Sequence, residues 1–252
     1  TLYHEFQTIT PITNEEDDIT HFIAIKQDIS ERKKMEVELR ATLAEKSTLF
    51  QELYHRTHNN MQIISNMLSL QMMKTNNQEL ENIAQDITNR IQAMSLVHEK
   101  LYKSNNLSQI DLEDYLTSLF DELYSNYKND NQQVTLNVHI PEITLLIDIL
   151  SPCGLIFNEL LTNSFEHSFP DQKDGTIFIK ITEDEDDIIT IKYSDNGLGL
   201  PTDFDISKHA GMGFELVQML VEYQLDGTFY VSSGDGFTCH IQFSNNKYTA
   251  RV

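Results

Sequence analysis

His55 is the residue whose position in this sequence is best suited to nucleophilic chemistry. It stands in a long polar segment that is predicted to be helical, with Glu52 and Asn59 toward the same side. A neutral imidazole can attack a phosphoryl group near neutral pH, and a neighbouring carboxylate can orient it or take its proton. On spacing alone, a solvated surface histidine is the simpler interpretation. A metal pair of His55 with His58 is less favoured still, because zinc needs more ligands.

A second polar pair lies in the segment from Asn158 to His167. Glu159 and Asn163 are one helical turn apart and therefore share one face of a helix. A carboxylate and an amide oxygen placed in this way can hold Mg²⁺, which takes few protein ligands and keeps waters and substrate phosphate. An ordinary polar helix face has the same spacing.

Two glycine-rich segments follow later in the chain. Asp195 ends a predicted strand and precedes Gly197 and Gly199, which let the backbone approach a ligand closely. An aspartate there can accept a hydrogen bond from an exocyclic amine, although a simple Asn-Gly turn also fits. Gly211 and Gly213 precede a predicted helix, whose N-terminal N–H groups favour an anion. No Walker A lysine pattern is present, which disfavours a P-loop NTPase.

The histidine belongs to a long helical segment. Residues 31–74 contain neither Gly nor Pro, and this length predicts a bundle or coiled coil rather than a single globular helix. A turn at residues 76–77 leads into a second helix. Two antiparallel helices with broad apolar stripes need a partner surface, and a two-fold dimer forming a four-helix bundle supplies it. The stripes are Tyr54, Thr57, Met61, Ile64, Leu68 and Met72 on the first helix, and Leu80, Ala84, Ile87, Ile91, Met94, His98 and Leu101 on the second.

The remaining chain mixes helices and strands without a repeating βαβ unit, which predicts an α/β sandwich. Upstream of the long helix, residues 6–10 and 21–29 alternate like strands, and they resemble the end of a domain that begins before this chain. The later helices are predicted at 111–128, 154–169 and 213–223, and the later strands at 134–140, 144–150, 176–182, 188–193, 228–232 and 237–243.

Composition excludes several classes of protein. The 18 basic and 39 acidic residues give a net charge of −21, which argues against nucleic-acid binding and against docking on an anionic membrane. No apolar run is long enough to span a bilayer, and no signal-peptide pattern is present. The two cysteines, Cys153 and Cys239, make no disulfide framework. We therefore expect a cytoplasmic protein without membrane contact in this segment.

In this order, the segments resemble those of a sensor histidine kinase. Residues 54–65 resemble the H-box of the subfamily in which the phosphoacceptor histidine is followed by arginine, the HWE-like kinases. Residues 158–167 resemble the N-box of the ATP-binding fold shared with gyrase, Hsp90 and MutL. Residues 195–199 and 211–213 are similar to its G1 and G2 boxes. Residues 23–32 are similar to the end of a PAS sensor domain and its exit helix.

The resemblance implies a role for each matching residue. His55 would be the phosphoacceptor, with Glu52 beside it, and Asn59 would position water for phosphatase action. Asn163 would bind Mg²⁺, and Glu159 would polarise the attack or the metal shell. The remaining residues would bind ATP: Asp195 through the adenine amino group, His167 and Lys208 at the nucleotide, and Gly197, Gly199, Gly211 and Gly213 in the phosphate lid.

Two residues depart from the family pattern. Glu166 stands where Lys or Arg is common, and a carboxylate facing a triphosphate costs affinity unless Lys173, Lys208 or Mg²⁺ compensates. His58 stands where the subfamily usually has Lys. Glu166 favours one rival interpretation, a catalytically weak nucleotide-binding scaffold, whereas Glu159 permits another, a gyrase-like ATPase without a phosphohistidine.

We therefore expect an α+β multidomain chain: a long-helix dimerisation bundle followed by an α/β sandwich. Residues 1–30 would end a PAS-like domain, 31–108 would form the signal helix and the phosphotransfer hairpin, and 109–252 would bind ATP. The expected partners are a second copy of the chain and the receiver domain of a response regulator, and the expected cofactors are ATP and Mg²⁺.

Overall fold

The computed structural model describes residues 3–15, 17–72, 77–103, 111–127, 133–141, 143, 145–170, 174–201 and 212–245. The chain divides into two compact units, Thr1–His55 and Arg56–Val252. Among the described helices, none is long and apolar enough to cross a membrane.

The first unit is an exposed hairpin that leads into a helix. Strands β1 (Glu5–Thr13) and β2 (Ile19–Asp28) pair antiparallel, which confirms the two predicted strands. All of their described residues are exposed. Helix α1 (Ser30–Met72) follows directly and has no buried residue. Assignment of the hairpin to a PAS domain stays a prediction.

The second unit contains the end of α1 and helix α2 (Gln78–Lys103). The sequence predicted one apolar stripe on α2, and Leu80 and Ile87 of that stripe are exposed. A different face of α2 is buried, through Ala93 and Val97, and it packs mainly on helix α4 (Ile147–Asn163). The exposed Leu80 and Ile87 are available for a partner, as the dimer hypothesis requires, whereas Ala84, Ile91, Met94 and His98 of the same stripe are half-buried.

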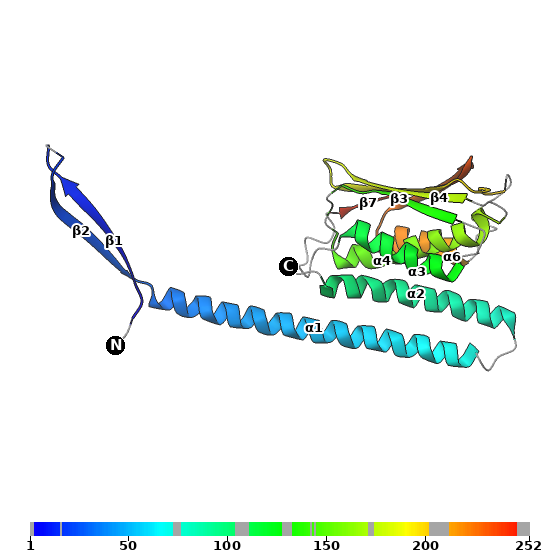
Figure 1. The fold of residues 1–252 in the computed structure, drawn as a ribbon, viewed down its shortest axis with the longest axis horizontal. Coiled ribbons are helices and arrows are strands. Elements are labelled where there is room, and N and C mark those ends of the chain that lie inside the picture. The colour runs from blue at the N-terminus through cyan, green and yellow to red at the C-terminus, as the bar shows by residue number, and fades with distance from the viewer. Residues whose placement is uncertain are drawn as a thin grey trace. The chain divides into compact units, whose positions relative to one another are not determined.

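A five-stranded sheet forms one layer of the second unit (Figure 1). Its order is β3-β4-β5-β7-β6, with β3 and β4 parallel and the other neighbours antiparallel. Along β4 and β5, buried and less buried residues alternate, as expected when one face of a sheet is covered. The strands are β3 (Gln133–His139), β4 (Asp174–Glu183), β5 (Ile188–Asp195), β6 (Thr228–Gly234) and β7 (Gly236–Ser244).

Three helices cover one face of this sheet and form the second layer (Figure 1). They are α3 (Leu112–Tyr127), α4 (Ile147–Asn163) and α6 (Met212–Met219), and short π-helical turns extend α4 over Ser164–Ser168 and α6 over Leu220–Gln224. The core between the layers is closely filled, and Phe157, Ile177 and Ile191 have no exposed surface. The predicted α+β organisation with an α/β sandwich is confirmed.

The strand predicted at residues 144–150 is wrong. Helix α4 begins at Ile147 and continues through Pro152. Proline normally disfavours the interior of a helix, so Pro152 argued against a helix here. The apolar residues before Pro152 also show no helical periodicity, because this helix is apolar on most of its sides. Ile149, Leu150 and Cys153 are all buried, so tertiary packing outweighs the local signals.

Candidate functional site

Glu159 lies at the centre of the N-box face of α4, where it is almost fully buried. Arg90 of α2 donates two hydrogen bonds to Glu159, from Nε to Oε1 at 2.8 Å and from Nη2 to Oε2 at 2.9 Å. Asn158 Nδ2 donates a third at 3.2 Å to Oε1. This bidentate ion pair raises the pKa of Arg90, mainly through the hydrogen bonds to Glu159. Glu159 is therefore a neutralised and oriented carboxylate.

The structure brings Asn163 and Gly213 to the same place. A β-carbon on Gly213 would lie 2.8 Å from Glu159 Oε2 and 3.8 Å from Asn163 Oδ1, so the start of α6 touches the N-box face. The three residues border a cavity of about 180 Å³ that also reaches Arg90. Residues predicted from two separate sequence segments thus lie together at one cavity.

The donors in this cavity suit Mg²⁺. Among the described residues, no group of three or more His, Cys, Asp or Glu side chains is arranged to hold a metal. Magnesium needs no such group, because one or two protein oxygens, waters and phosphates complete its shell. Both oxygens of Glu159 already accept from Arg90, whereas Asn163 lies half-buried at the cavity. Asn163 is thus the better candidate ligand.

Asp195 ends β5 inside a dense hydrogen-bond network. Its Oδ2 accepts from the hydroxyls of Ser164 at 2.7 Å and Ser168 at 2.8 Å. Its Oδ1 accepts from the backbone N–H of Gly197 at 2.9 Å and of Phe237 at 3.3 Å. The carboxylate is only 4% exposed, and it ties the end of α4 to the turn after β5. Asp195 therefore shapes the predicted adenine pocket structurally, besides any contact with a ligand.

The glycines of the turn after β5 lie where a side chain would clash or would strain the backbone. Gly197 lies so near Ser168 that a β-carbon would come within 2.3 Å of the Ser168 carbonyl oxygen. Gly199 has a φ of +69°, which other residues seldom adopt. The predicted nucleotide-binding residue Lys208 and the predicted lid residue Gly211 lie outside the described residues.

His55, Glu52 and Asn59 all lie on α1 with exposed side chains, as the helical periodicity predicted. His58 differs, because it is half-buried and lines a cavity of about 470 Å³ between α1, α2 and α3. Glu122 of α3 lines the same cavity, and burial raises the pKa of its carboxyl. The two neighbouring histidines of the H-box thus occupy different environments.

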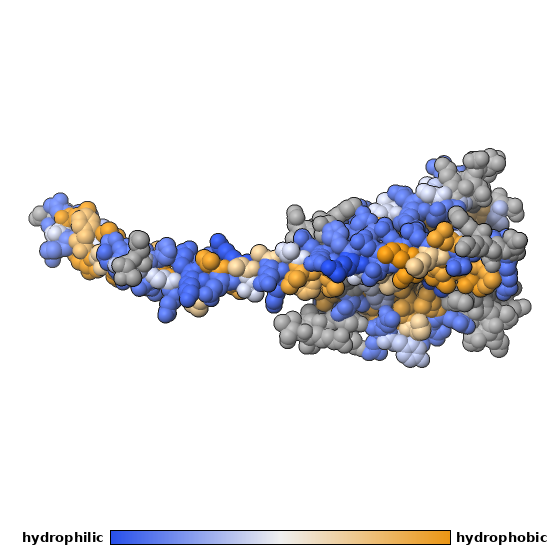
Figure 2. Space-filling model, turned by 90° about the horizontal axis from the view of Figure 1, so that it is seen from below, coloured by the Kyte–Doolittle hydropathy of each residue, from blue (hydrophilic) through white to orange (hydrophobic). Residues whose placement is uncertain are grey.

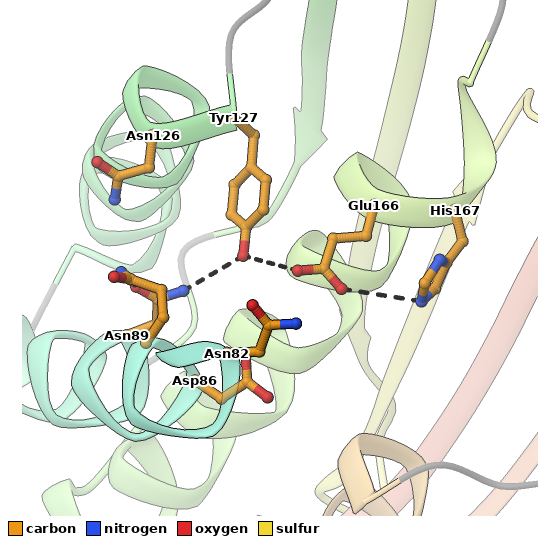
Figure 3. Close-up of a pocket in the computed structure, with 8 residues that line it drawn as sticks. Asn82, Asp86, Asn89, Asn126, Tyr127, Glu166 and His167 are labelled. Carbon is orange, nitrogen blue, oxygen red and sulfur yellow. Dashed lines mark hydrogen bonds and ion pairs between the residues drawn. The ribbon is translucent and has the colours of Figure 1, made fainter. Parts of the chain in front are cut away.

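Glu166 and His167 lie in the π-helical turn and border a different, larger cavity of about 740 Å³ (Figure 3). The side chain of His167 is 73% exposed, with Nε2 3.8 Å from the Glu166 carboxylate. Glu166 also lines the cavity of about 180 Å³ beside Glu159 and Asn163, whereas His167 does not. His167 therefore does not border the cavity of Glu159 and Asn163, and its predicted contact with the nucleotide stays a prediction.

Sequence reasoning missed Arg90, Ser164 and Ser168 as site residues. The available signal for Arg90 was its charge, since basic residues are few in this acidic chain and Arg90 lies one turn after Asp86. The serines carried no signal of their own, because small polar residues at the end of a helix are common.

Comparison with known families identifies the chain. A family model described as histidine kinase matches residues 52–127, which include His55. A second model, the histidine kinase-, DNA gyrase B- and HSP90-like ATPase, matches residues 151–247, and together the two cover more than half of the chain. The chain belongs to the histidine kinases. The resemblance to histidine kinases found in the sequence is thereby confirmed for the segments that these two models match.

Relatives of this histidine kinase include two kinases that are themselves named histidine kinases. Sensor histidine kinase PdtaS of Mycobacterium tuberculosis is 28% identical over 207 residues, covering 80% of this chain and 39% of the relative. Blue-light-activated histidine kinase 2 of Erythrobacter litoralis is 20% identical, covering 84% of this chain and 60% of the relative. The chain therefore spans only part of the length of these relatives.

Solved structures share the fold of this histidine kinase. The histidine kinase domain of the Erythrobacter litoralis EL346 blue-light-activated kinase superposes with a TM-score of 0.57 at 18% identity, covering 74% of this chain and 97% of that one. The longer EL346 structure gives a TM-score of 0.59 at 17% identity, covering 98% of this chain and 72% of that one.

Proposed function

We propose that this histidine kinase phosphorylates its own His55 from MgATP and passes the phosphoryl group to the receiver domain of a response regulator. It would act in the cytoplasm as a homodimer in two-component signalling. The observation that carries the proposal is the state of His55: it is exposed on α1 within the segment that the histidine kinase model matches, in a chain that also carries the ATPase fold.

The described residues supply the parts that such a transfer needs. Asp195 would accept a hydrogen bond from the adenine amino group, and Asn163 would hold Mg²⁺, which neutralises phosphate charge when bound. An imidazole nitrogen of His55 would then attack the γ-phosphorus, while the bond to the β,γ-bridging oxygen breaks and ADP leaves. Glu52 would accept the imidazole proton. Catalysis rests on positioning and charge neutralisation.

Radiolabel transfer from ATP tests this proposal. The parent protein should acquire a label that is acid-labile and base-stable, as expected for a phosphoramidate. His55→Gln should lose the label yet still bind ATP. His58→Gln is the matched control and should keep it, because His58 is half-buried at the α1–α2–α3 cavity. An acid-stable label, or its loss only in the His58 variant, would contradict the assignment.

The same measurements separate the two rival functions. A signalling scaffold would bind nucleotide but neither label itself nor release phosphate. A gyrase-like ATPase would release phosphate steadily without labelling. Asn59→Ala adds a test of the proposed phosphatase role, since it should slow dephosphorylation of the receiver domain and leave the labelling of His55 unchanged.

The proposed dimer rests on apolar side chains that the second unit leaves uncovered. Figure 2 shows hydrophobic patches on the face of the second unit that is seen from below. Sedimentation of the chain should give a dimer at micromolar concentration, and Ile64→Glu or Ile87→Glu should weaken it. Tyr223→Glu, at a more exposed site away from the helical hairpin of α1 and α2, is the control. The exposed apolar residues of the helical hairpin formed by α1 and α2 include Ile63, Ile64, Met67, Leu70, Leu80, Ile83 and Ile87.

A further inference from the structure

The ion pair between Arg90 and Glu159 joins the helical hairpin to the nucleotide site. Arg90 belongs to α2 and Glu159 to α4, and 69 residues separate them in the chain. The two side chains are 18% and 8% exposed, so the pair is largely shielded from water. An interaction of this kind depends on its geometry much more than a surface pair does.

Packing of α2 on α4 holds Arg90 in place. Ala93 and Val97 follow Arg90 by one and two turns on the same face of α2, and both are fully buried. Gly154 of α4 admits the close approach, since a β-carbon there would lie 3.1 Å from Val97 Cγ2 and 2.4 Å from the Tyr115 hydroxyl. The guanidinium is therefore positioned by a closely packed part of the interface between α2 and α4.

The cavity beside Glu159 suits water. Its volume is about 180 Å³, which is enough for several water molecules. Asn158 Oδ1 and Thr162 Oγ1 border it and have no hydrogen-bond partner within the described part of the chain, although Asn158 is only 2% exposed. Buried polar atoms of this kind are commonly satisfied by ordered water.

Water next to a carboxylate and a bound triphosphate creates a competing reaction. The water oxygen would bond to the γ-phosphorus, its proton would pass to Glu159, and the bond to the β,γ-bridging oxygen would break to release ADP. A general base must reach the proton that it removes. In this structure both oxygens of Glu159 are directed to Arg90, and Oε1 also accepts from Asn158.

We propose that Arg90 is a positioning residue that withholds Glu159 from water, so that the γ-phosphoryl group goes to the histidine and is not lost to hydrolysis. This inference rests on the proposed function, because it presupposes transfer to His55. Arg90 does not act on the phosphoryl group itself. It acts by occupying the carboxylate, and only while α2 is docked on α4.

The test is the ratio of phosphate released to histidine labelled in the full chain with MgATP. Arg90→Met should raise this ratio about tenfold or more, since a freed general base typically contributes a factor of that size or larger. Arg90→Lys keeps the charge but not the two parallel hydrogen bonds, so its ratio should fall between those of the parent and Arg90→Met. A purely structural role would lower both reactions together and leave the ratio unchanged.

The double variant Arg90→Met/Glu159→Gln separates loss of the base from loss of folding. It lacks the same ion pair without leaving a buried unpaired charge, and its ratio should return to the parent value or below. Lys100→Met is the matched control, because it removes another ion pair of α2, to Asp114 of α3, away from the N-box. Its ratio should equal that of the parent.

The inference is overturned if folded Arg90→Met has an unchanged ratio, or if the double variant continues to release phosphate. In either case, labelling of His55 in the parent still supports the proposed function. If Arg90→Met does not fold, an unchanged ratio in Arg90→Lys has the same meaning. If the parent releases phosphate but does not label His55, both the proposed function and the inference fail.

Discussion

The hydroxyl of Tyr127 donates a hydrogen bond of 3.0 Å to the carboxylate of Glu166 (Figure 3). Asn89 Nδ2 donates to the same hydroxyl at 3.3 Å, and the Tyr127 ring stacks on Phe165. Burial and the Glu166 carboxylate raise the pKa of Tyr127, so the phenol remains a donor at neutral pH. The acidic residue that departs from the family pattern thus belongs to an ordered network between α2, α3 and the end of α4.

Replacing Glu166 should strengthen nucleotide binding. Glu166→Gln keeps an acceptor for Tyr127 and removes a negative charge, so MgATP should bind roughly 2- to 5-fold more tightly without loss of stability. Glu166→Lys should bind more tightly still but unfold at a lower temperature, because Tyr127 loses its acceptor. Asp121→Lys, an exposed change on α3, is the control. Calorimetric affinities equal to the parent value in both Glu166 variants would show that this carboxylate does not influence the phosphates.

Asp195→Asn should weaken both the fold and nucleotide binding. The amide loses the charge that receives two serine and two backbone donors, at a cost of about 1.5–3 kcal/mol for hydrogen bonds to a charged group. Thermal unfolding and calorimetry measure the two effects separately. Asp174→Asn, at the exposed start of β4, should change neither. Parent-like ATP affinity in folded Asp195→Asn would place the adenine elsewhere.

Gly154→Ala should destabilise the second unit by about 1–3 kcal/mol, because the new methyl group would overpack a fully buried contact with Tyr115. Urea unfolding measures this change in the free energy of unfolding. Gly234→Ala is a matched control, since no atom lies within 4 Å of the added carbon. Equal unfolding midpoints for the two variants would mean that α2 and α4 can separate at little cost.

The second unit should lose stability in mild acid through His98. Burial lowers the pKa of His98 below 6.5, and the nearby His58 adds to the effect. A group with a lower pKa in the folded state gains protons on unfolding, so the free energy of unfolding contributed by His98 falls as pH drops below about 6.5. Glu122 opposes this, because burial and Glu99 raise its pKa and such a carboxyl favours the folded state as pH falls.

Comparison of variants isolates the histidine. Between about pH 7 and about pH 5.5, His98→Gln should lose less stability than the parent, whereas His139→Gln, exposed on β3, should follow the parent. Chemical unfolding across this range provides the measurement. Identical pH dependence of the parent and His98→Gln would show that the pKa of His98 is the same in the folded and the unfolded chain, which contradicts this prediction.

Local chemistry explains what the sequence alone could predict. The H-box, the N-box and the glycine segments can each be recognised from a few consecutive residues, and the periodicity of apolar residues in helices and strands is also a local property. The sequence therefore determined the family, the order of elements, the exposed position of His55 and the shared face of Glu159 and Asn163. It failed at α4, where burial on most sides removed the helical period and Pro152 gave a misleading stop signal.

Only the tertiary structure decided which of these segments meet. Arg90 reaches Glu159, Tyr127 reaches Glu166, and Ser168 reaches Asp195 across 69, 39 and 27 residues. No local pattern encodes such pairs, because they depend on how one element packs against another. That packing is set by shape, at contacts such as Gly154 against Val97 and Tyr115, where the absence of a side chain lets two helices approach.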